Sequence, residues 1–204
     1  MRVISRAADV RAAATTPSRA MKRAVAWLAL LALPFLAYPE TVDLGTHGML
    51  SISVPSGWRL SSHKEEDTGV AITLSPPAPV NAKCLLNVTY VAEPKPVAKE
   101  AVDEQVLSVC DQFVDQSVEK RKTLRELGMP GGAYGSYCVF TDASMVGKAS
   151  APDEFKVIGI GIIHFRDDVM AAVSLAADDA GGGDFASMLA AVRSTSVSAG
   201  KTGP

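Results

Sequence analysis

Three histidines and two adjacent aspartates are the residues with the clearest potential for chemistry. His164 ends a predicted strand and is followed closely by Asp167 and Asp168. A histidine beside carboxylates can transfer protons or hold a cation. His47 and His63 fall in loop-like sequence, and none of the three histidines has partners at the local spacing typical of a metal site. The sequence therefore predicts no catalytic, metal or cofactor residue, and it keeps a small hydrolase or metal-dependent enzyme with a site near His164, Asp167 and Asp168 as the alternative.

The three cysteines, Cys84, Cys110 and Cys138, are the second set of reactive residues. Two of them fall on predicted strands, and Cys110 falls on the apolar side of a predicted helix. In an oxidising compartment two of the three can be joined by a disulfide, although the spacing does not say which two. The alternative is three buried, reduced thiols that pack as small hydrophobic side chains. No Cys-x-x-Cys motif is present, which argues against a redox enzyme.

Motifs for a nucleophile or a phosphate site are missing from the chain. Neither Gly-x-Ser-x-Gly nor Gly-x-x-x-x-Gly-Lys-Ser/Thr occurs. The glycine run at 181–183 leads into Asp184, whose carboxylate would repel a phosphate group. Asn87 begins a glycosylation acceptor sequence, but it lies in the middle of a predicted strand. These observations favour a protein that is not an enzyme.

The N-terminal segment has the pattern of an export signal. Lys22 and Arg23 precede an apolar run of 14 residues, 24–37, which is shorter than the roughly 20 residues that span a bilayer. Ala37 suits a cleavage site, whereas the bulky Phe35 does not. We therefore expect an exported protein, periplasmic or secreted, with an uncleaved N-terminal anchor as the second interpretation. Membrane contact is then expected only through this signal segment.

Residues 1–20, ahead of this signal, are rich in arginine and small residues. Either Met21 is the true initiator, or residues 1–20 begin a bipartite organelle-targeting peptide. The domains predicted are an extension and signal peptide over 1–37 and a single domain over 38–204. Removing the six basic residues and one acidic residue of 1–37 from totals of 20 and 22 leaves 14 and 21, a formal charge of −7. An acidic domain disfavours binding to nucleic acid.

The rest of the chain alternates between strand-like and helix-like patterns. Polar and apolar residues alternate over 84–91, as in a half-buried strand. Apolar residues recur every three or four positions over 97–118 and over 185–192, as in amphipathic helices. The charged segment 63–68 is expected to be a hairpin loop, and the polar residues 166–168 a turn. The predicted strand segments are 51–54, 58–60, 70–74, 84–91, 122–127, 137–141, 155–165 and 169–175.

Strands joined by hairpins cannot run parallel, so the sheet must be largely antiparallel. The order of elements predicts an α+β fold, with a sheet of about six strands and two main helices packed on it, preceded by an N-terminal signal helix. Trp58 follows a Ser-Gly turn, where a large aromatic side chain is expected to pin the corner.

The order of these elements resembles the Mog1/PsbP-like fold family. The resemblance covers 45–197 and lies in the opening SISVPSGWRL, the helix after the third strand, the hairpin FKVIGIGIIHFRDDVMAAVSLA and the closing FASMLAAVRS. Members of the family include thylakoid-lumen photosystem II accessory proteins, a nuclear Ran-binding protein and many exported bacterial proteins. They act mainly as binding or assembly factors, and the resemblance implies the same here. It carries over no ligand-binding residue.

The leading hypothesis is therefore an exported, non-enzymatic binding or assembly factor of the cell envelope. Its expected partner is another envelope protein, met through a sheet edge, loops or a helix face, with no cofactor and no nucleic acid. A role in a photosynthetic lumen depends on residues 1–20 being a transit peptide. A small-molecule carrier with a pocket between helix and sheet is the third hypothesis.

Overall fold

A computed structural model describes residues 38–65 and 68–200 of the 204-residue chain. The predicted signal segment, 1–37, lies outside the described residues. Within the part described, no helix combines the length and the apolar character needed to cross a membrane. The strands are β1 (Tyr38–Asp43), β2 (Met49–Val54), β3 (Arg59–Glu65), β4 (Gly69–Ser75), β5 (Ala82–Tyr90), β6 (Arg125–Glu126), β7 (Tyr134–Thr141), β8 (Val157–Arg166), β9 (Val169–Ala177) and β10 (Ser196–Val197); the helices are α2 (Lys99–Val114), α3 (Gly183–Arg193) and the 3-10 turns η1 (Gly45–His47) and η2 (Ala143–Met145).

Seven strands form one antiparallel sheet in the order β3-β4-β5-β9-β8-β7-β6. Every pair in this sheet is antiparallel, so the predicted α+β fold with an antiparallel sheet is confirmed. Strands β8 and β9 form the predicted hairpin around the polar turn after Arg166. A second, three-stranded sheet has the order β1-β2-β10 and is also antiparallel.

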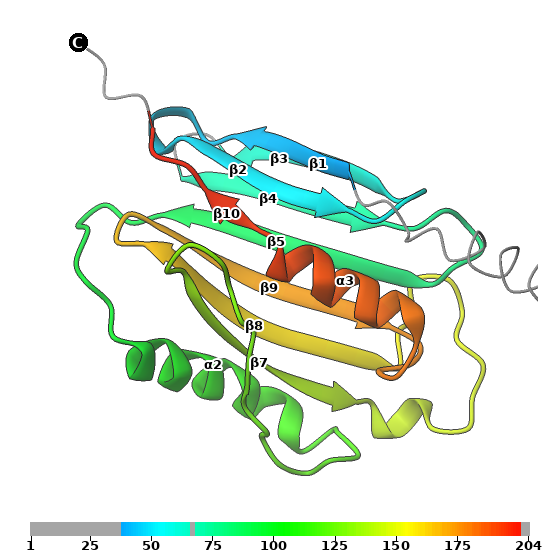
Figure 1. Cartoon of the computed structure of the whole chain (residues 1–204). Coiled ribbons are helices and arrows are strands. Elements are labelled where there is room, and N and C mark those ends of the chain that lie inside the picture. The colour runs from blue at the N-terminus through cyan, green and yellow to red at the C-terminus, as the bar shows by residue number, and fades with distance from the viewer. Residues whose placement is uncertain (1–37, 66–67, 201–204) are drawn as a thin grey trace, which may run out of the picture. The chain divides into compact units, whose positions relative to one another are not determined.

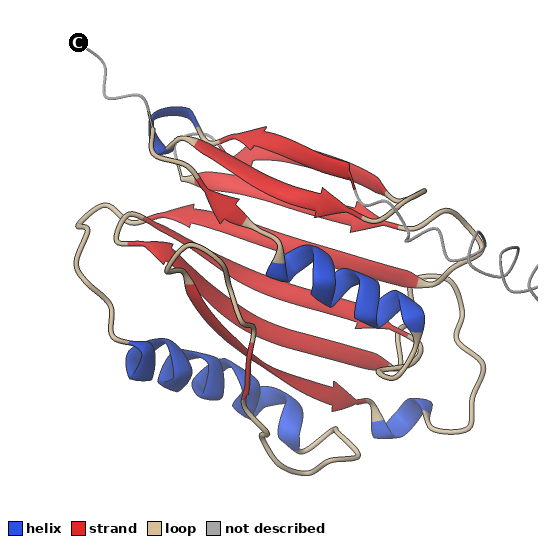
Figure 2. Ribbon diagram, in the orientation of Figure 1, coloured by secondary structure: helices blue, strands red, loops and turns tan. Residues whose placement is uncertain are grey.

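The two helices pack against different parts of the large sheet. Helix α2 buries Val102, Val106 and Cys110, which are spaced four residues apart, against β7 and β8. Helix α3 packs on β9, β5 and β2 through an apolar side that includes Phe185 and Met188. Figure 1 shows the two helices lying beside different strands, and Figure 2 separates them by colour from the strands.

The buried side chains form two clusters of unequal size. The larger cluster joins both sheets and α3, and its members include Leu50 and Ile72 from the two sheets. The smaller cluster lies under α2 and consists of Val106, Cys110, Cys138, Phe140 and Ile160. Burial of apolar surface in such clusters is the main stabilising term of the fold.

One expectation about the strands was wrong in detail. The segment from His63 to Glu65 belongs to β3, so the expected loop at 63–68 is shorter than predicted. Strand β3 lies at the edge of the sheet and is almost wholly exposed, so its sequence lacks the alternation that marks a half-buried strand. The large sheet has seven strands, in agreement with the expected sheet of about six, and β1, β2 and β10 form a small sheet of their own.

Candidate functional site

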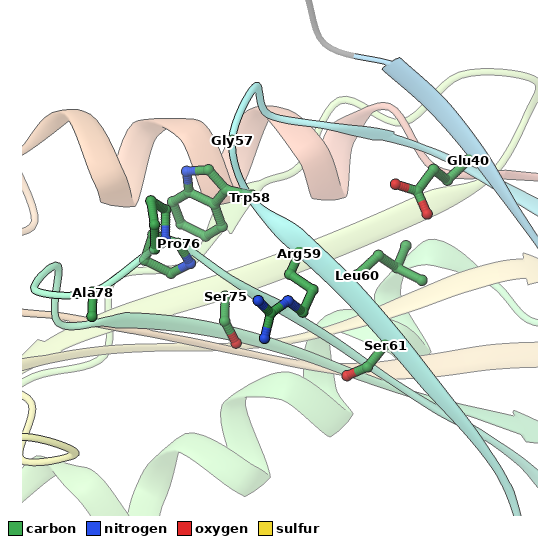
Figure 3. Close-up of a pocket in the computed structure, with 10 residues that line it drawn as sticks. Glu40, Gly57, Trp58, Arg59, Leu60, Ser61, Ser75, Pro76 and Ala78 are labelled. Atoms are coloured by element: carbon green, nitrogen blue, oxygen red, sulfur yellow. The ribbon is translucent and has the colours of Figure 1, made fainter.

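An open groove of about 700 Å³ lies beside Trp58. Its walls are Glu40 of β1, residues 57–61 at the start of β3 and residues 75–78, which begin at the last residue of β4. We call this the Trp58 groove. Figure 3 shows its lining residues as sticks, with the Trp58 ring beside Pro76. It therefore gathers side chains from three segments of the chain.

A tight turn places Trp58 at the mouth of this groove. The backbone N–H of Trp58 donates to the carbonyl of Pro55 over 3.0 Å, which closes the turn between β2 and β3. Gly57 adopts a φ of 80°, a value that favours glycine because it carries no Cβ. The indole packs partly against the large core and is only half-buried. The predicted role of Trp58 at the corner therefore holds, and part of the ring stays open to a ligand.

Two charged side chains of opposite sign face the groove. Glu40 and Arg59 are both exposed, and neither forms an ion pair with another residue in the described ranges. In Figure 3 the guanidinium group of Arg59 extends toward Ser75. These charges are therefore free to pair with complementary charges on a ligand.

The groove also borders two free strand edges. Strand β1 pairs only with β2, and β3 pairs only with β4, among the residues that the structure describes. One ion pair joins the two strands, between Lys64 Nζ and Asp43 Oδ2 at 3.2 Å. A backbone hydrogen bond from Gly45 and the Lys64 ammonium together lower the pKa of Asp43. An edge strand leaves backbone N–H and C=O groups available to another chain.

A second polar cluster forms around Asp168, on the turn between β8 and β9. Its carboxylate accepts hydrogen bonds from Arg166 Nε at 2.6 Å and lies 2.7 Å from His47 Nδ1. The His47 ring stacks on Tyr90 with centroids 4.0 Å apart. Arg166 also donates to the backbone carbonyls of His47 and Ser198. The cluster therefore joins η1 and the segment after β10 to the β8–β9 hairpin.

The pKa of Asp168 reflects this environment. Partial burial acts to raise the pKa, but the hydrogen bonds from Arg166 and His47 outweigh burial and hold it below its usual value. The carboxylate is therefore ionised and fully engaged by its neighbours. This arrangement suits a structural tether better than a proton-transfer site.

The sequence-predicted alternative site does not assemble in this structure. Asp168 contacts His47 and Arg166, while Asp167 is exposed. Among the described residues, no hydrogen bond or ion pair links His164 to either aspartate, and the buried Nε2 of His164 has no hydrogen-bond partner. No group of three or more His, Cys, Asp or Glu side chains over 38–65 and 68–200 could hold a metal ion. His47 was missed because its partner lies 121 residues away in sequence, and no local pattern could have found it.

All three cysteines are free and buried in the structure, and none lies within disulfide distance of another. Cys84 lies in the large core, while Cys110 and Cys138 belong to the small cluster under α2. Burial raises the pKa of Cys84 to about 12. Burial, together with a hydrogen bond to Cys138, raises the pKa of Cys110 to about 12 as well. Of the two alternatives that the sequence left open, the structure shows the free thiols and no disulfide, and the thiols have the environment of packing residues.

Comparison with known proteins adds a similarity of fold. No protein-family model matches the chain, and no curated protein is detectably similar in sequence. The chain is similar to the solution structure of cyanobacterial PsbP (CyanoP) from Synechocystis sp. PCC 6803, with a TM-score of 0.44 and 10% sequence identity. The match covers 82% of this chain and 96% of that chain. The match assigns no role to any residue of this chain.

Proposed function

We propose that this chain is an exported, non-enzymatic binding or assembly factor of the cell envelope. In this proposal it binds an extended segment of another protein along the free edge of β3, next to the Trp58 groove. The observation that carries the proposal is the combination, at one place, of a half-buried tryptophan and a strand edge that pairs with no other strand in the described part of the chain.

Strand addition explains why these two features belong together. An extended peptide that pairs with an exposed edge gains backbone hydrogen bonds, while pockets beside the edge select its side chains. Trp58 and Pro76 offer an apolar surface for one such side chain. Glu40 and Arg59 add opposite charges on the two sides of the groove, which favour one orientation of the bound segment. The edge thus supplies affinity and the groove supplies selectivity.

Charged residues on β3 fit the same proposal. His63, Lys64 and Glu65 are exposed on this strand, and charged side chains at an edge hinder pairing between copies of the same chain. A specific partner must then match these charges. The export part of the proposal is supported by the basic residues and the apolar run before Tyr38 in the sequence.

Site-specific photocrosslinking in the native host tests this proposal. A photoreactive phenylalanine analogue is placed at Ser62, which is exposed on β3, and as a control at Glu104, which is exposed on α2. We expect one discrete crosslinked product in the envelope fraction from Ser62 and none from Glu104. Trp58→Ala in the Ser62 variant should remove the product.

Three results would argue against the proposal. These are the absence of a product from Ser62, an equal product from Glu104, and a product that Trp58→Ala does not change. The export part is tested separately, by measuring the N-terminal residue of the chain recovered from the envelope fraction. A chain found only in the cytoplasm contradicts export.

A further inference from the structure

A second, smaller cavity lies at the C-terminal end of α2, on the other side of the large sheet from α3. It has a volume of about 250 Å³ and is lined by apolar side chains of Phe113, Phe140, Phe155 and Ile158. We call this the phenylalanine pocket. Ala176 of β9 also lines it, and Lys156 and Gln116 are among its polar residues. The pocket is therefore an apolar cavity with polar groups around it, the usual composition of a small-molecule site.

The walls of this pocket are held by hydrogen bonds and ring packing. Phe113 of α2 stacks on Phe140 of β7, with centroids 5.7 Å apart and an interplanar angle of 24°. The chain after α2 is joined to the end of β7 by the bond from Val118 N–H to the Thr141 carbonyl at 2.8 Å. The segment that carries Phe155 returns through the bond from Asp142 N–H to the Lys156 carbonyl at 2.8 Å. The backbone around the cavity is thus held by hydrogen bonds.

The acidic side chains near the pocket have hydrogen-bond partners, whereas the basic side chain that lines it has no ion-pair partner among the described residues. Asp142 accepts a bond from Ser144 N–H at 2.7 Å, and Glu119 accepts bonds from Thr141 N–H and Oγ1 at 2.9 and 2.8 Å. Bonds from Ser144 lower the pKa of Asp142; for Glu119, burial acts to raise the pKa, but the bonds from Thr141 outweigh it. Lys156 lines the pocket and forms no ion pair with any residue in the described part of the chain. The charge still open to a ligand is therefore the cation.

We propose that the phenylalanine pocket binds a compact aromatic carboxylate, with its ring among Phe113, Phe140 and Phe155 and its carboxylate facing Lys156. Aromatic rings pack favourably against one another in stacked or edge-to-face contact. A cavity of about 150 Å³ accepts one benzene molecule, so a pocket of about 250 Å³ suits a ligand of about ten non-hydrogen atoms. This site is independent of the Trp58 groove and goes beyond the proposed binding of a protein partner.

Calorimetric titration of the full chain with 3-phenylpropionate tests the site. We expect saturable binding that is about fivefold weaker for the neutral analogue 3-phenylpropan-1-ol, because the alcohol cannot pair with Lys156. Lys156→Gln should weaken binding of the acid by the same factor and leave binding of the alcohol unchanged. Equal affinities for acid and alcohol, or no saturable binding of the acid, would overturn the proposal.

Two alanines of β9 provide a matched pair of variants. Ala176 lines the pocket, whereas Ala172 is exposed on the same face of the same strand, about 13 Å away at four residues' distance. Ala176→Phe should fill the cavity and weaken binding of 3-phenylpropionate more than tenfold, while Ala172→Phe leaves it unchanged. Equal effects of the two variants would contradict the assignment. Trp58→Ala should not affect this titration, so failure here is distinguishable from failure of the Trp58 groove.

Discussion

The Trp58 groove and the phenylalanine pocket use the same sheet in different ways. The groove lies where β3, at the edge of the large sheet, and β1, at the edge of the small sheet, each pair with only one strand among the described residues, and Glu40 and Arg59 are exposed there. The pocket lies on a face of the sheet, where β7 pairs with β8 along its whole length and α2 packs against both strands. An edge can offer hydrogen bonds to another chain, whereas a covered face can only offer side chains. This difference is the reason why we propose a polymeric partner for the groove and a small molecule for the pocket.

The residues of the two sites should also differ in their contribution to the free energy of unfolding. Phe140→Ala measures this contribution for the pocket. Phe140 is 2% exposed and belongs to the small cluster under α2. Removing a buried phenylalanine ring costs about 3–4 kcal/mol in unfolding free energy. Urea unfolding of the full chain measures the loss, with Val118→Ala as control because Val118 is exposed just after α2. A loss no larger than that of the control would show that the pocket wall is not part of a core.

Trp58→Ala should have a smaller effect on stability than Phe140→Ala. The indole of Trp58 is only half-buried and packs against the large core from outside. About half of the cost of a buried tryptophan, roughly 2 kcal/mol, is therefore expected. The same urea experiment measures it, alongside the loss of crosslinking at Ser62. If Trp58→Ala cost more than Phe140→Ala, the groove would be a structural corner and the comparison of the two sites would fail.

The sequence predicted the pocket-side elements better than the groove. In β5, in α2 and in the β8–β9 hairpin, apolar residues recur with the period of a strand or a helix. These elements were therefore predicted, including the side of α2 that carries Val102 and Val106. The sequence of β3 shows no such alternation of polar and apolar residues, because both faces of this strand are exposed to solvent. The residues that line the groove could not be predicted, because the position of β3 at the sheet edge follows only from the tertiary fold.

The phenylalanine pocket shows a different limit of sequence reasoning. Phe113 could be placed on the apolar side of its helix, but Phe140 and Phe155 meet it only through the register that pairs Phe140 with Ile158. His47 and Asp168 are likewise joined by tertiary structure alone. Periodicity gives the burial of a residue, and it does not give the partner across the sheet. A pocket between helix and sheet was thus foreseen as a class and not as a set of residues.

Asp168→Asn tests what holds the β1 side of the groove in place. The native carboxylate has a lowered pKa, so its contribution to stability is present above the unfolded pKa of about 4 and is lost as pH falls through the folded pKa. We expect a loss of about 1 kcal/mol at pH 7, after solvent screening of a partly exposed group. Unfolding in urea at pH 7 and pH 3 measures both effects.

The outcome at low pH separates Asp168 from other carboxylates. The difference between the variant and the parent chain should shrink at pH 3, because the parent carboxylate is then becoming protonated. Crosslinking from Ser62 should weaken in the variant if η1 and β1 move when their tether to Arg166 is lost. A difference in stability that stays constant from pH 7 to pH 3 contradicts a role for the ionised carboxylate.

Chemical labelling of the three cysteines compares the two buried clusters without any substitution in the chain. Their raised pKa values, about 12 for Cys84 and Cys110, predict negligible reaction of the native protein with a thiol reagent at pH 8. Reaction must then follow local opening, whose free energy is lower where fewer buried contacts are broken. Cys110 and Cys138 lie in the small cluster under α2, and Cys84 lies on a central strand in the large core.

We therefore expect Cys110 and Cys138 to be labelled before Cys84 in low concentrations of urea, as mass spectrometry of peptides can show. Saturation of the phenylalanine pocket with 3-phenylpropionate should slow labelling of the first two and leave Cys84 unchanged, because a ligand held under α2 opposes its opening. A total of three labelled thiols after full unfolding, without prior reduction, is expected from the free cysteines of the structure. Simultaneous labelling of all three at low urea would show that α2 and the sheet open as one unit, and the two sites would then share a single core.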